Sequence, residues 1–491
     1  MKNTKVTTLV FFVIFISTIF RLWYINKVEL TPDECYYWEW SRKLDYSYMD
    51  QGPMLGLVIF LSTKLIGSST EFTVRLPAVI LGMFSSLFTV QILKNIHLST
   101  STVQLFAVLL LNLIPFIFLG QMIMTHDNVQ IFFWILSSYM FYKAITKILM
   151  DKPSLKYWIL TGIFCGLNLM SKYTGILLVL CVIVYLISHT RFTKFLIKKE
   201  FWIFITIVFI SSLPMIVWNI KNGFPTYKYL FTSGVVFRPY TTLSFRSILE
   251  FVISQCGLMT PLIFFAFIYS IYKYLKVKNY IQNWIIINTV VVFLFFLFLA
   301  GISKFEANWP AVGYFGVVVL TSQLYHNIYH KKFGKTYILT SFVFCFLLNL
   351  VVLVDLAKPI FPFSSLGDDK VRTGKSLAEE INKIFETEKI KDPEIMLLCD
   401  YYWYAAQLAF YTKKEVVCID TGKPLRQYSL WSKLKKGQNF LYITTDEILH
   451  NNVVNSFKKI TLNKVLYIKL RQTKNFTSQI KFYVYNCHSY I

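Results

Sequence analysis

The chain has 491 residues, of which 55% are hydrophobic and only 15% are charged, whereas soluble domains carry roughly 25% charged residues. Its mean hydropathy is +0.51, and several windows of about 18 residues are nearly uncharged, about the length that crosses the hydrocarbon core of a bilayer. This composition excludes a soluble globular enzyme and predicts a polytopic membrane protein. The formal charge of +24 does not indicate nucleic-acid binding, because the basic residues lie mostly between apolar runs, where orientation signals and anionic lipids account for them.

Hydropathy predicts about eleven spanning helices. The first apolar run lacks a small-residue cleavage site and is therefore interpreted as a retained helix rather than a signal peptide. The predicted spans are 6–25, 72–93, 102–123, 129–149, 157–170, 174–189, 201–218, 249–272, 282–301, 309–325 and 337–356.

Basic residues are concentrated in alternate loops, and the positive-inside rule places those loops in the cytoplasm. They are Lys2, Lys5, Lys94, Lys143, Lys147, Lys152, Lys156, Arg191, Lys194, Lys198, Lys199, Lys273, Lys276, Lys278, Lys331, Lys332 and Lys335. The opposite loops, which hold the acidic segment 26–71, "MTHDN", "SKYTG", the connection 219–248 and "SKFEANWP", are predicted to face outside. In a Gram-negative cell that side of the inner membrane is the periplasm.

The chain becomes polar from about Lys358 onward. Strand-like runs "EIMLLC", "EVVCID", "FLYITT" and "KVLYIKL" alternate with helix-like "KSLAEEINKIFETE" and "YYWYAAQLAFY", a pattern typical of a small soluble α/β domain. We therefore predict a membrane domain at 1–356 and an outer domain at 357–491. The tail cysteines Cys399, Cys418 and Cys487 would allow one disulfide, which their spacing does not decide.

The first outer loop gathers carboxylates beside the bilayer. Asp33 and Glu34 follow Pro32, which favours an extended Thr31 and so ends the first membrane helix nearby. A carboxylate at this boundary could act as a general base on a lipid-borne substrate. The alternative is a solvated interfacial loop in which Asp33 caps a helix and the neighbouring aromatic residues form an interfacial belt.

The other outer loops supply a second acid and several cations. Asp127 in "MTHDN" could take part in the same chemistry or cap the helix that follows. Lys172 and Lys304, with Arg75 and Arg238 as further members, could capture an anionic head group or extend to lipid headgroups from helix ends. Carboxylates and scattered cations on one face suggest a lipid substrate that carries phosphate.

Metal and nucleotide motifs are not found in the sequence. There is no HExxH and no paired-cysteine motif for zinc, and no Walker A or GxGxxG for a nucleotide. His326 and His330 stand four apart but lie on the predicted cytoplasmic side. A sugar nucleotide would also be cytoplasmic, so the donor is expected to have crossed the membrane already.

The segment "PDECYYWEWSRKL…YSYMDQGPMLGLVIFLSTKLIGSSTEFTVRLPAVI" resembles the opening of bacterial membrane glycosyltransferases related to protein O-mannosyltransferases and to the aminoarabinose transferase that modifies lipid A. Similarity continues, in the same order, through "MTHDN", "GLNLMSKYTGILL", "LPMIVWNIKNGFPTYKYL", "ISQCGLMTPLIFF" and "SKFEANWPAVGYF". It covers most of residues 1–356. Relatives carry an acid followed by Lys-Pro or His-Pro in the first loop, where this chain has Asp50, Gln51, Gly52 and Pro53.

The resemblance implies a GT-C fold and a sugar donor on a polyprenyl phosphate such as undecaprenyl phosphate. It places Asp33 at the reaction centre with Glu34 beside it, and Asp127 as the second acid. The remaining candidates bind donor phosphate or substrate: Asp50, Arg75, Lys172, Arg238, Lys304, Glu306 and Asn308. The expected reaction is inverting displacement at the anomeric carbon, with cations stabilising the leaving phosphate and lipid A or another envelope glycan as acceptor.

Three other functions are compatible with the sequence. A protein O-mannosyltransferase would act on secreted Ser or Thr residues. A transporter for lipid-linked sugars would place ionisable groups near the midplane and show inverted repeats, neither of which is visible. A scaffold would bind envelope glycans without chemistry. Membrane lipids are expected partners and nucleic acids are not, while the sequence leaves a divalent-metal requirement open.

Overall fold

The computed structural model describes residues 2–95, 100–231, 243–277, 279–358, 373–473 and 476–491. The chain divides into two compact units. We call the first the helical unit; it comprises Met1–Ile25, Gln51–Leu55 and Arg75–Val351. The second, which we call the sheet unit, comprises Asn26–Asp50, Gly56–Val74 and Val352–Ile491.

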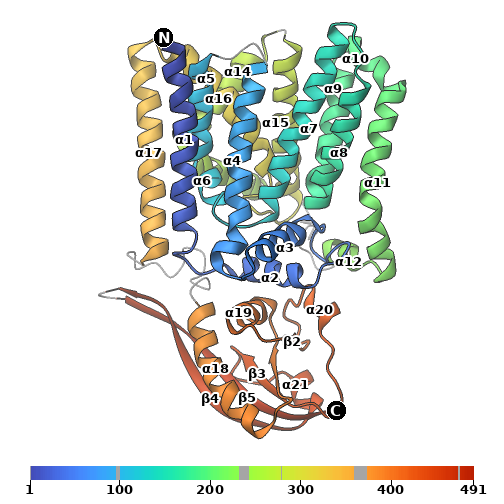
Figure 1. The fold of residues 1–491 in the computed structure, drawn as a ribbon, viewed down its shortest axis with the longest axis vertical. Coiled ribbons are helices and arrows are strands. Elements are labelled where there is room, and N and C mark those ends of the chain that lie inside the picture. Colours follow the sequence, from blue (N-terminus) through green and yellow to red (C-terminus); the bar gives the residue numbers. More distant parts are fainter. Residues whose placement is uncertain (1, 96–99, 232–242, 278, 359–372, 474–475) are drawn as a thin grey trace. The chain divides into compact units, whose positions relative to one another are not determined.

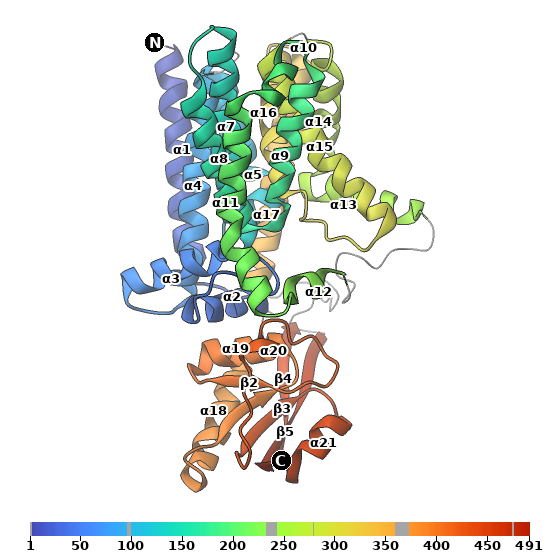
Figure 2. The same cartoon turned by 90° about the vertical axis from the view of Figure 1, so that its right-hand side faces the viewer.

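Helices build the helical unit, and the long ones run side by side, whereas α12 lies crosswise and α13 is tilted away from them (Figures 1 and 2). They are α1 (Lys2–Tyr24), α4 (Glu71–Asn95), α5 (Ser101–Leu113), α6 (Pro115–Gly120), α7 (His126–Leu149), α8 (Leu155–Ser171), α9 (Leu177–Ser188), α10 (Thr190–Thr193), α11 (Lys199–Lys221), α12 (Pro225–Phe231), α13 (Phe245–Met259), α14 (Pro261–Tyr274), α15 (Tyr280–Ile302), α16 (Tyr314–Ile328) and α17 (Lys332–Ala357). Short 3₁₀ turns η1 (Tyr173–Ile176), η2 (Lys194–Ile197) and η3 (Ala311–Gly313) lie between them.

Each of the eleven predicted spans contains helix, and the multi-pass character is confirmed. Within the described residues, five helices are long and apolar enough to cross a membrane, or seven if two bent pairs each count as one span. The five are α1, α4, α11, α15 and α17. The count of eleven stays a prediction, because several of the remaining helices are shorter or more polar than that test requires.

Two predicted spans are not continuous helices. The run 102–123 is divided into α5 and α6 at Ile114, and 249–272 is divided into α13 and α14, which meet at a bend of 108°. Both breaks precede a proline, Pro115 or Pro261. Proline disfavours helical geometry in the preceding residue, and Ile114 accordingly leaves the helical region with a ψ of 120°. Thr260 is also non-helical, at a φ of 72° and a ψ of 147°. The hydropathy profile does not register such a break, so the predicted boundaries were wrong here.

The basic loops lie together at one end of the helical unit. The N-terminus of α1 and the short helix α10 mark this end (Figure 1). The C-terminal ends of α4, α7, α14 and α16 also lie at this end (Figure 1). The "MTHDN", "SKYTG" and "SKFEANWP" segments lie at the opposite end. The spatial arrangement therefore groups the loops as the charge pattern predicts.

Small residues bring two of these helices together. Gly162 and Gly166, one turn apart on α8, face α11, and a Cβ atom added at Gly166 would lie 2.2 Å from Ser211 Oγ. Close approach at a small-xxx-small pattern is a common way for membrane helices to associate. A buried hydrogen bond of 2.8 Å from Trp134 Nε1 to Asn288 Oδ1 ties α7 to α15.

The sheet unit combines a five-stranded mixed sheet with helices. Its strands are β1 (Met396–Cys399), β2 (Val416–Cys418), β3 (Phe440–Thr444), β4 (Phe457–Thr473) and β5 (Phe476–Tyr490), in the order β2-β1-β3-β5-β4. Strands β1, β2 and β3 are parallel, whereas β5 is antiparallel to both β3 and β4. Its helices are α2 (Pro32–Arg42), α3 (Met54–Ile66), α18 (Gly374–Lys391), α19 (Tyr402–Thr412), α20 (Tyr428–Trp431) and α21 (Asn451–Ser456).

The predicted α/β tail is thus confirmed as a small sheet with helices, but β5 was not predicted. Cys399 and Cys418 are register partners on β1 and β2, and both are free thiols, as is Cys487. The possible disulfide is therefore not formed. Burial raises the pKa of the Cys399 and Cys418 thiols, which keeps them protonated and chemically inert.

Helix α2, from the first loop, packs against α19 of the C-terminal segment. Tyr36 and Tyr402 approach to 5.1 Å between ring centroids, and Trp38 meets Phe410 edge to face at 5.0 Å. Tyr36 is completely buried. The alternative that the aromatic residues of this segment form an interfacial belt is not realised for these side chains, because they form part of a packed core.

Candidate active site

An acid, a cation and an amide from three separate loops meet in the helical unit. Asp127 lies in the first turn of α7, Lys172 ends α8, and Asn308 lies between α15 and α16. Lys172 Nζ donates to Asp127 Oδ1 at 2.7 Å, and Asn308 Nδ2 donates to Asp127 Oδ2 at 3.1 Å. All three residues are sequence-predicted site residues, and they come from the motifs "MTHDN", "SKYTG" and "SKFEANWP".

Local hydrogen bonds leave the Asp127 carboxylate available for this cluster. The start of α7 is capped by Asn128, whose Oδ1 accepts from the backbone N–H of Thr125 at 2.8 Å. Asn128 Nδ2 in turn donates to the carbonyl of Gly120 at 2.7 Å. The alternative that Asp127 itself caps the helix is therefore not realised: Thr125 and Asn128 cap the helix, and Asp127 pairs with Lys172.

The backbone after Lys172 is held by a residue of the first loop. Gln51 Oε1 accepts from the backbone N–H of Tyr173 at 3.1 Å, at the point where α8 gives way to η1. Gln130 Nε2 donates to Thr174 Oγ1 at 2.9 Å. A neutral amide of the first loop therefore positions the segment that follows Lys172.

The cluster is shielded from water but not sealed. The side chains of Lys172 and Asp127 are 9% and 13% exposed. In such surroundings an ammonium group interacts with an incoming anion more strongly than it does in water. Lys172 uses one of its three N–H donors on Asp127. The arrangement can therefore hold a phosphate oxygen beside a carboxylate that fixes the lysine.

A second cluster, in the sheet unit, links the first-loop acids to the C-terminal segment. Tyr402 Oη donates to Asp33 Oδ1 at 3.2 Å, and Tyr36 Oη donates to Asp50 Oδ2 at 2.5 Å. The guanidinium of Arg426 lies 4.4 Å from the Tyr402 ring centroid and 3.3 Å from Asp50 Oδ1. The two predicted acids Asp33 and Asp50 are thus joined through two tyrosines and one arginine.

The tyrosine hydroxyls of this second cluster stay protonated. Burial raises the pKa of Tyr36, and the nearby Asp50 carboxylate raises it further. Burial also raises the pKa of Tyr402, although the positive charge of Arg426 opposes the shift. Both hydroxyls therefore act as hydrogen-bond donors that orient Asp33 and Asp50 throughout the physiological pH range.

The remaining predicted residues fall outside both clusters. Glu34 is fully buried, and its Oε2 accepts from the backbone N–H of Thr31 at 2.9 Å, so it completes the cap of α2. Thr31 rather than Asp33 is the N-cap residue, which corrects the capping alternative. Arg75 donates to the carbonyl of Ile25 at 2.9 Å. Lys304 and Glu306 are exposed. Arg238 lies outside the described residues.

Sequence reasoning missed Arg426 and did not assign a role to Tyr402. Arg426 lies in a stretch without a recognisable motif, and its ion-pair partner Asp50 is far away along the chain. The sequence does predict the helix that carries Tyr402, because "YYWYAAQLAFY" is a helix-like run. The prediction that Asp33 and Asp127 share one pocket stays a prediction, since they belong to different units.

Comparison with known proteins gives three findings. The family model described as dolichyl-phosphate-mannose-protein mannosyltransferase matches residues 50–218. A curated relative, the lipid A galacturonosyltransferase RgtD of Rhizobium johnstonii, is 23% identical over 312 residues, covering 61% of this chain and 63% of the relative. The chain thus spans less than two thirds of that relative's length.

Among solved structures, the chain is similar to ArnT from Cupriavidus metallidurans. The apo structure matches with a TM-score of 0.70 at 11% identity, and the structure bound to undecaprenyl phosphate matches with a TM-score of 0.67 at 13% identity. Each match covers 98% of both chains. At such identities the likeness concerns the fold, and it extends over the helical unit and the sheet unit alike. The resemblance predicted from the sequence is confirmed.

Proposed function

We propose that this chain, which belongs to the GT-C superfamily of membrane glycosyltransferases, transfers a sugar from a polyprenyl-phosphate carrier to a lipid A-type acceptor. The similar proteins support both the proposed donor and the proposed acceptor. One is named as a lipid A galacturonosyltransferase, and one solved structure contains undecaprenyl phosphate. The identity of the sugar is left open, because no residue described above selects it.

The observation that carries the proposal is the meeting of Asp127, Lys172 and Asn308 from three loops at one end of the helical unit. A scaffold would not need a shielded charge pair at that place. A transporter would be expected to place its ionisable groups near the bilayer midplane, whereas these residues lie at helix ends. A site that stabilises a departing lipid phosphate needs a fixed cation near the membrane surface, which Lys172 provides.

In the proposed mechanism the sugar leaves its carrier by inverting displacement at the anomeric carbon. The acceptor oxygen forms the new bond as the bond to the phosphate oxygen breaks, and the electron pair leaves with the phosphate. Lys172 stabilises that charge while Asp127 holds the lysine in place. Asp33, oriented by Tyr402, accepts the proton of a hydroxyl acceptor, a role that typically contributes about 10²–10⁴-fold in rate. A phosphate acceptor carries no such proton, and Asp33 then only orients it.

We place the reaction at the periplasmic face of the inner membrane. The loops that carry the cluster lie at the end of the helical unit opposite the basic loops (Figure 1), and basic loops favour the cytoplasm. A sugar that is already linked to a lipid carrier does not require a cytoplasmic sugar nucleotide for its transfer.

The test compares three variants in a strain that lacks the native gene, with mass spectrometry of lipid A as the readout. We expect Asp33→Asn and Lys172→Gln to reach the membrane at normal levels and to lower transfer at least about 100-fold. Asp45→Asn is the matched control, because Asp45 is an exposed acid of the same loop. Normal transfer by Asp33→Asn would remove Asp33 from the reaction, and unchanged lipid A in the deletion strain would refute the acceptor.

A second candidate is protein O-mannosyl transfer, which the description of the matching family model over residues 50–218 favours. It uses the same donor class and the same displacement, but the acceptor is a Ser or Thr hydroxyl. Loss of mannose from secreted proteins in the deletion strain, with lipid A unchanged, would select this candidate over the first.

A further inference from the structure

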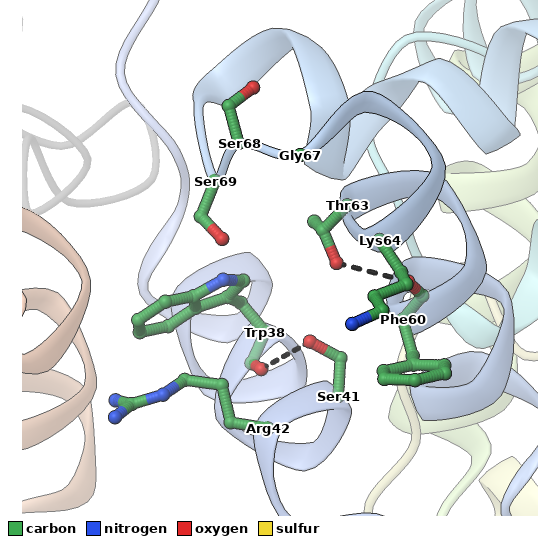
Figure 3. Close-up of a pocket in the computed structure, with 9 residues that line it drawn as sticks. All are labelled: Trp38, Ser41, Arg42, Phe60, Thr63, Lys64, Gly67, Ser68 and Ser69. Carbon is green, nitrogen blue, oxygen red and sulfur yellow. Dashed lines mark hydrogen bonds between the residues drawn. The ribbon is translucent and has the colours of Figure 1, made fainter.

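A cavity of about 570 Å³ lies in the sheet unit between α2, α3 and the turn that follows α3 (Figure 3). Its wall carries two cations, four hydroxyl groups and two aromatic rings. The residues that line it are Trp38, Ser41, Arg42, Phe60, Thr63, Lys64, Gly67, Ser68 and Ser69. This cavity contains none of the residues that the proposed transfer reaction uses.

The hydrogen-bond donors that line the cavity differ in whether they already have a partner within the protein. Arg42 Nη1 is held by Glu39 Oε1 at 2.7 Å, so its charge is largely offset. Within the described part of the chain, Lys64 has no ion-pair partner, and the hydroxyls of Ser68 and Ser69 make no hydrogen bond. Gly67, at a φ of +75°, allows the tight turn that places both serines at the cavity. One free ammonium and two free hydroxyls therefore border the same space.

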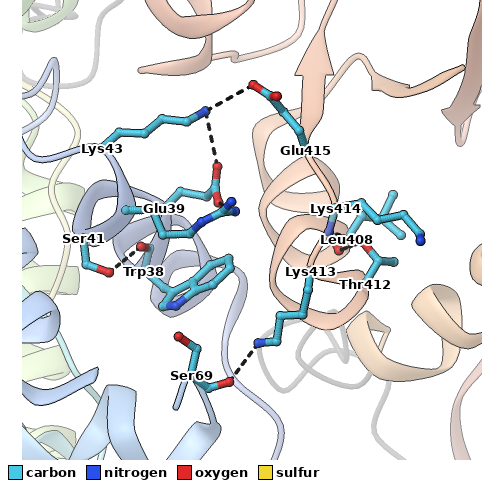
Figure 4. Close-up of polar contacts among 11 residues, drawn as sticks. Trp38, Glu39, Ser41, Lys43, Ser69, Leu408, Thr412, Lys413, Lys414 and Glu415 are labelled. Atoms are coloured by element: carbon cyan, nitrogen blue, oxygen red, sulfur yellow. Dashed lines mark hydrogen bonds and ion pairs between the residues drawn. The ribbon is translucent and has the colours of Figure 1, made fainter. Parts of the chain in front are cut away.

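The floor of the cavity is held rigid by Trp38. Its ring lies 4.8 Å from the Arg42 guanidinium carbon and 4.8 Å from Lys413 Nζ. Lys413 Nζ also donates to the carbonyl of Ser69 at 2.8 Å, which fixes the serine turn against the ring (Figure 4). Trp38 is 3% exposed, and its Nε1 has no hydrogen-bond partner among the described residues. The edge that carries this nitrogen is turned toward Ser69 (Figure 3).

Exposed leucines beside the cavity indicate where it opens. Leu57, Leu61 and Leu65 of α3 recur every four residues, so they share one face of the helix, and they are 38%, 48% and 85% exposed. Lys64 falls on the same face. A helix with exposed leucines and a lysine at the apolar edge is typical of a segment that lies in the membrane interface. The free ammonium is then at headgroup level.

We propose that this cavity binds the phosphate headgroup of an anionic membrane lipid, with Lys64 as the counter-charge and Ser68 and Ser69 as hydrogen-bond donors. The acyl chains would lie along the leucine face of α3. A zwitterionic headgroup carries its own cation beside the phosphodiester, which repels Lys64, whereas the phosphodiester of an anionic lipid offers its negative charge and acceptor oxygens to the three free donors. The site would anchor the first-loop helices to one class of lipid, independently of the transfer reaction.

The experiment titrates the full-length protein in detergent micelles with phosphatidylglycerol and, separately, with phosphatidylcholine of the same acyl chains. Native mass spectrometry reports the apparent Kd of the first bound lipid. We expect wild type to prefer phosphatidylglycerol about tenfold. We expect Lys64→Gln and the double variant Ser68→Ala/Ser69→Ala to lose most of this preference, since each removes charge-assisted bonds to the phosphate.

Two control variants separate a built site from diffuse charge. Lys64→Arg keeps the positive charge and should retain the preference. Lys221→Gln removes an exposed lysine at the end of α11, outside the cavity, and should also retain it. All four changes affect exposed or partly exposed side chains and leave the core intact, and an unchanged Tm verifies this.

Three results would overturn the proposal. One is a Lys64→Gln protein that binds phosphatidylglycerol as tightly as wild type. Another is an equal loss in Lys64→Gln and Lys221→Gln, which would indicate only general electrostatic attraction. The third is displacement of the lipid by soluble glycerol 3-phosphate at comparable concentration, which would assign the cavity to a soluble phosphate.

Discussion

The Asp127–Lys172 pair gives the sharpest test of the candidate site, because its two members are expected to depend on each other. We consider Asp127→Asn, Lys172→Met and the double variant. Asp127→Asn keeps the shape of the side chain and leaves the Lys172 ammonium without its partner. Lys172→Met keeps much of the apolar stem and leaves the carboxylate with only Asn308. The double variant removes both charges together.

The magnitude follows from the geometry. At 2.7 Å two unit charges attract by about 6 kcal/mol at an effective dielectric constant of about 20, and the cost of removing both from water offsets much of this. Breaking such a shielded pair from one side costs about 3 kcal/mol, the lower end of the range for buried pairs, since both side chains keep some exposure. For the helical unit, which has about 300 residues, a loss of 3 kcal/mol in the free energy of unfolding corresponds to a fall in Tm of about 5 °C.

The assay is thermal unfolding of the purified protein in detergent, followed by tryptophan fluorescence. We expect each single variant to lose about 5 °C and the double variant to lose clearly less than either single, because it leaves no unpaired charge. Glu306→Gln, an exposed acid of the same loop as Asn308, should leave Tm unchanged. If the losses of the two single variants simply add in the double variant, the pair is not coupled and the reasoning fails.

Two further predictions concern packing and titration. Gly166→Ala should destabilise the protein by about 1–3 kcal/mol in the same thermal assay, because the new Cβ would meet Ser211 Oγ at 2.2 Å. Gly257→Ala, with open space around the added Cβ, is the control, and equal effects would contradict close packing of α8 on α11. Partial burial beside Trp38 and Phe410 lowers the pKa of Lys413 to about 8. Between pH 8 and about 10.4 the unfolded chain therefore binds more protons than the folded chain, and the stability of the sheet unit should rise with pH across that window. At pH 8 about half of the Lys413 amines are unprotonated, against under about 1% for an ordinary lysine, so acylation mapped by peptide mass spectrometry should label Lys413 before the exposed Lys458; equal rates would refute the lowered pKa.

Hydropathy and loop charge predicted the positions of the helices because both act locally along the chain. The breaks in the predicted helices at Ile114 and Thr260 were not predicted, although Pro115 and Pro261 follow these residues in the sequence. An apolar run of uniform hydropathy carries no information about a bend that one proline introduces. The strand β5 was missed because it mixes polar and apolar residues, whereas the short parallel strands are continuous apolar runs that are almost entirely buried.

The residues of the candidate site also differ in whether the local sequence predicts them. Asp127, Lys172 and Asn308 could be proposed together because each follows a membrane helix on the same side, and their loops must therefore meet at one face. Arg426 could not be proposed, because its contact with Asp50 depends on how the C-terminal segment folds onto α2. No periodicity within either segment encodes that pairing.

The contact between the first loop and the C-terminal segment also restricts the topology. Asp33 and Tyr402 are 369 positions apart and share a hydrogen bond inside one compact unit. A polar, hydrogen-bonded unit of this kind cannot be divided by a bilayer, because its backbone groups would lose their partners in hydrocarbon. The loop after the first span and the tail after the last span must then lie on the same side of the membrane. An odd number of crossings meets this condition whatever the count: five, seven and eleven spans all do, whereas any even number separates Asp33 from Tyr402.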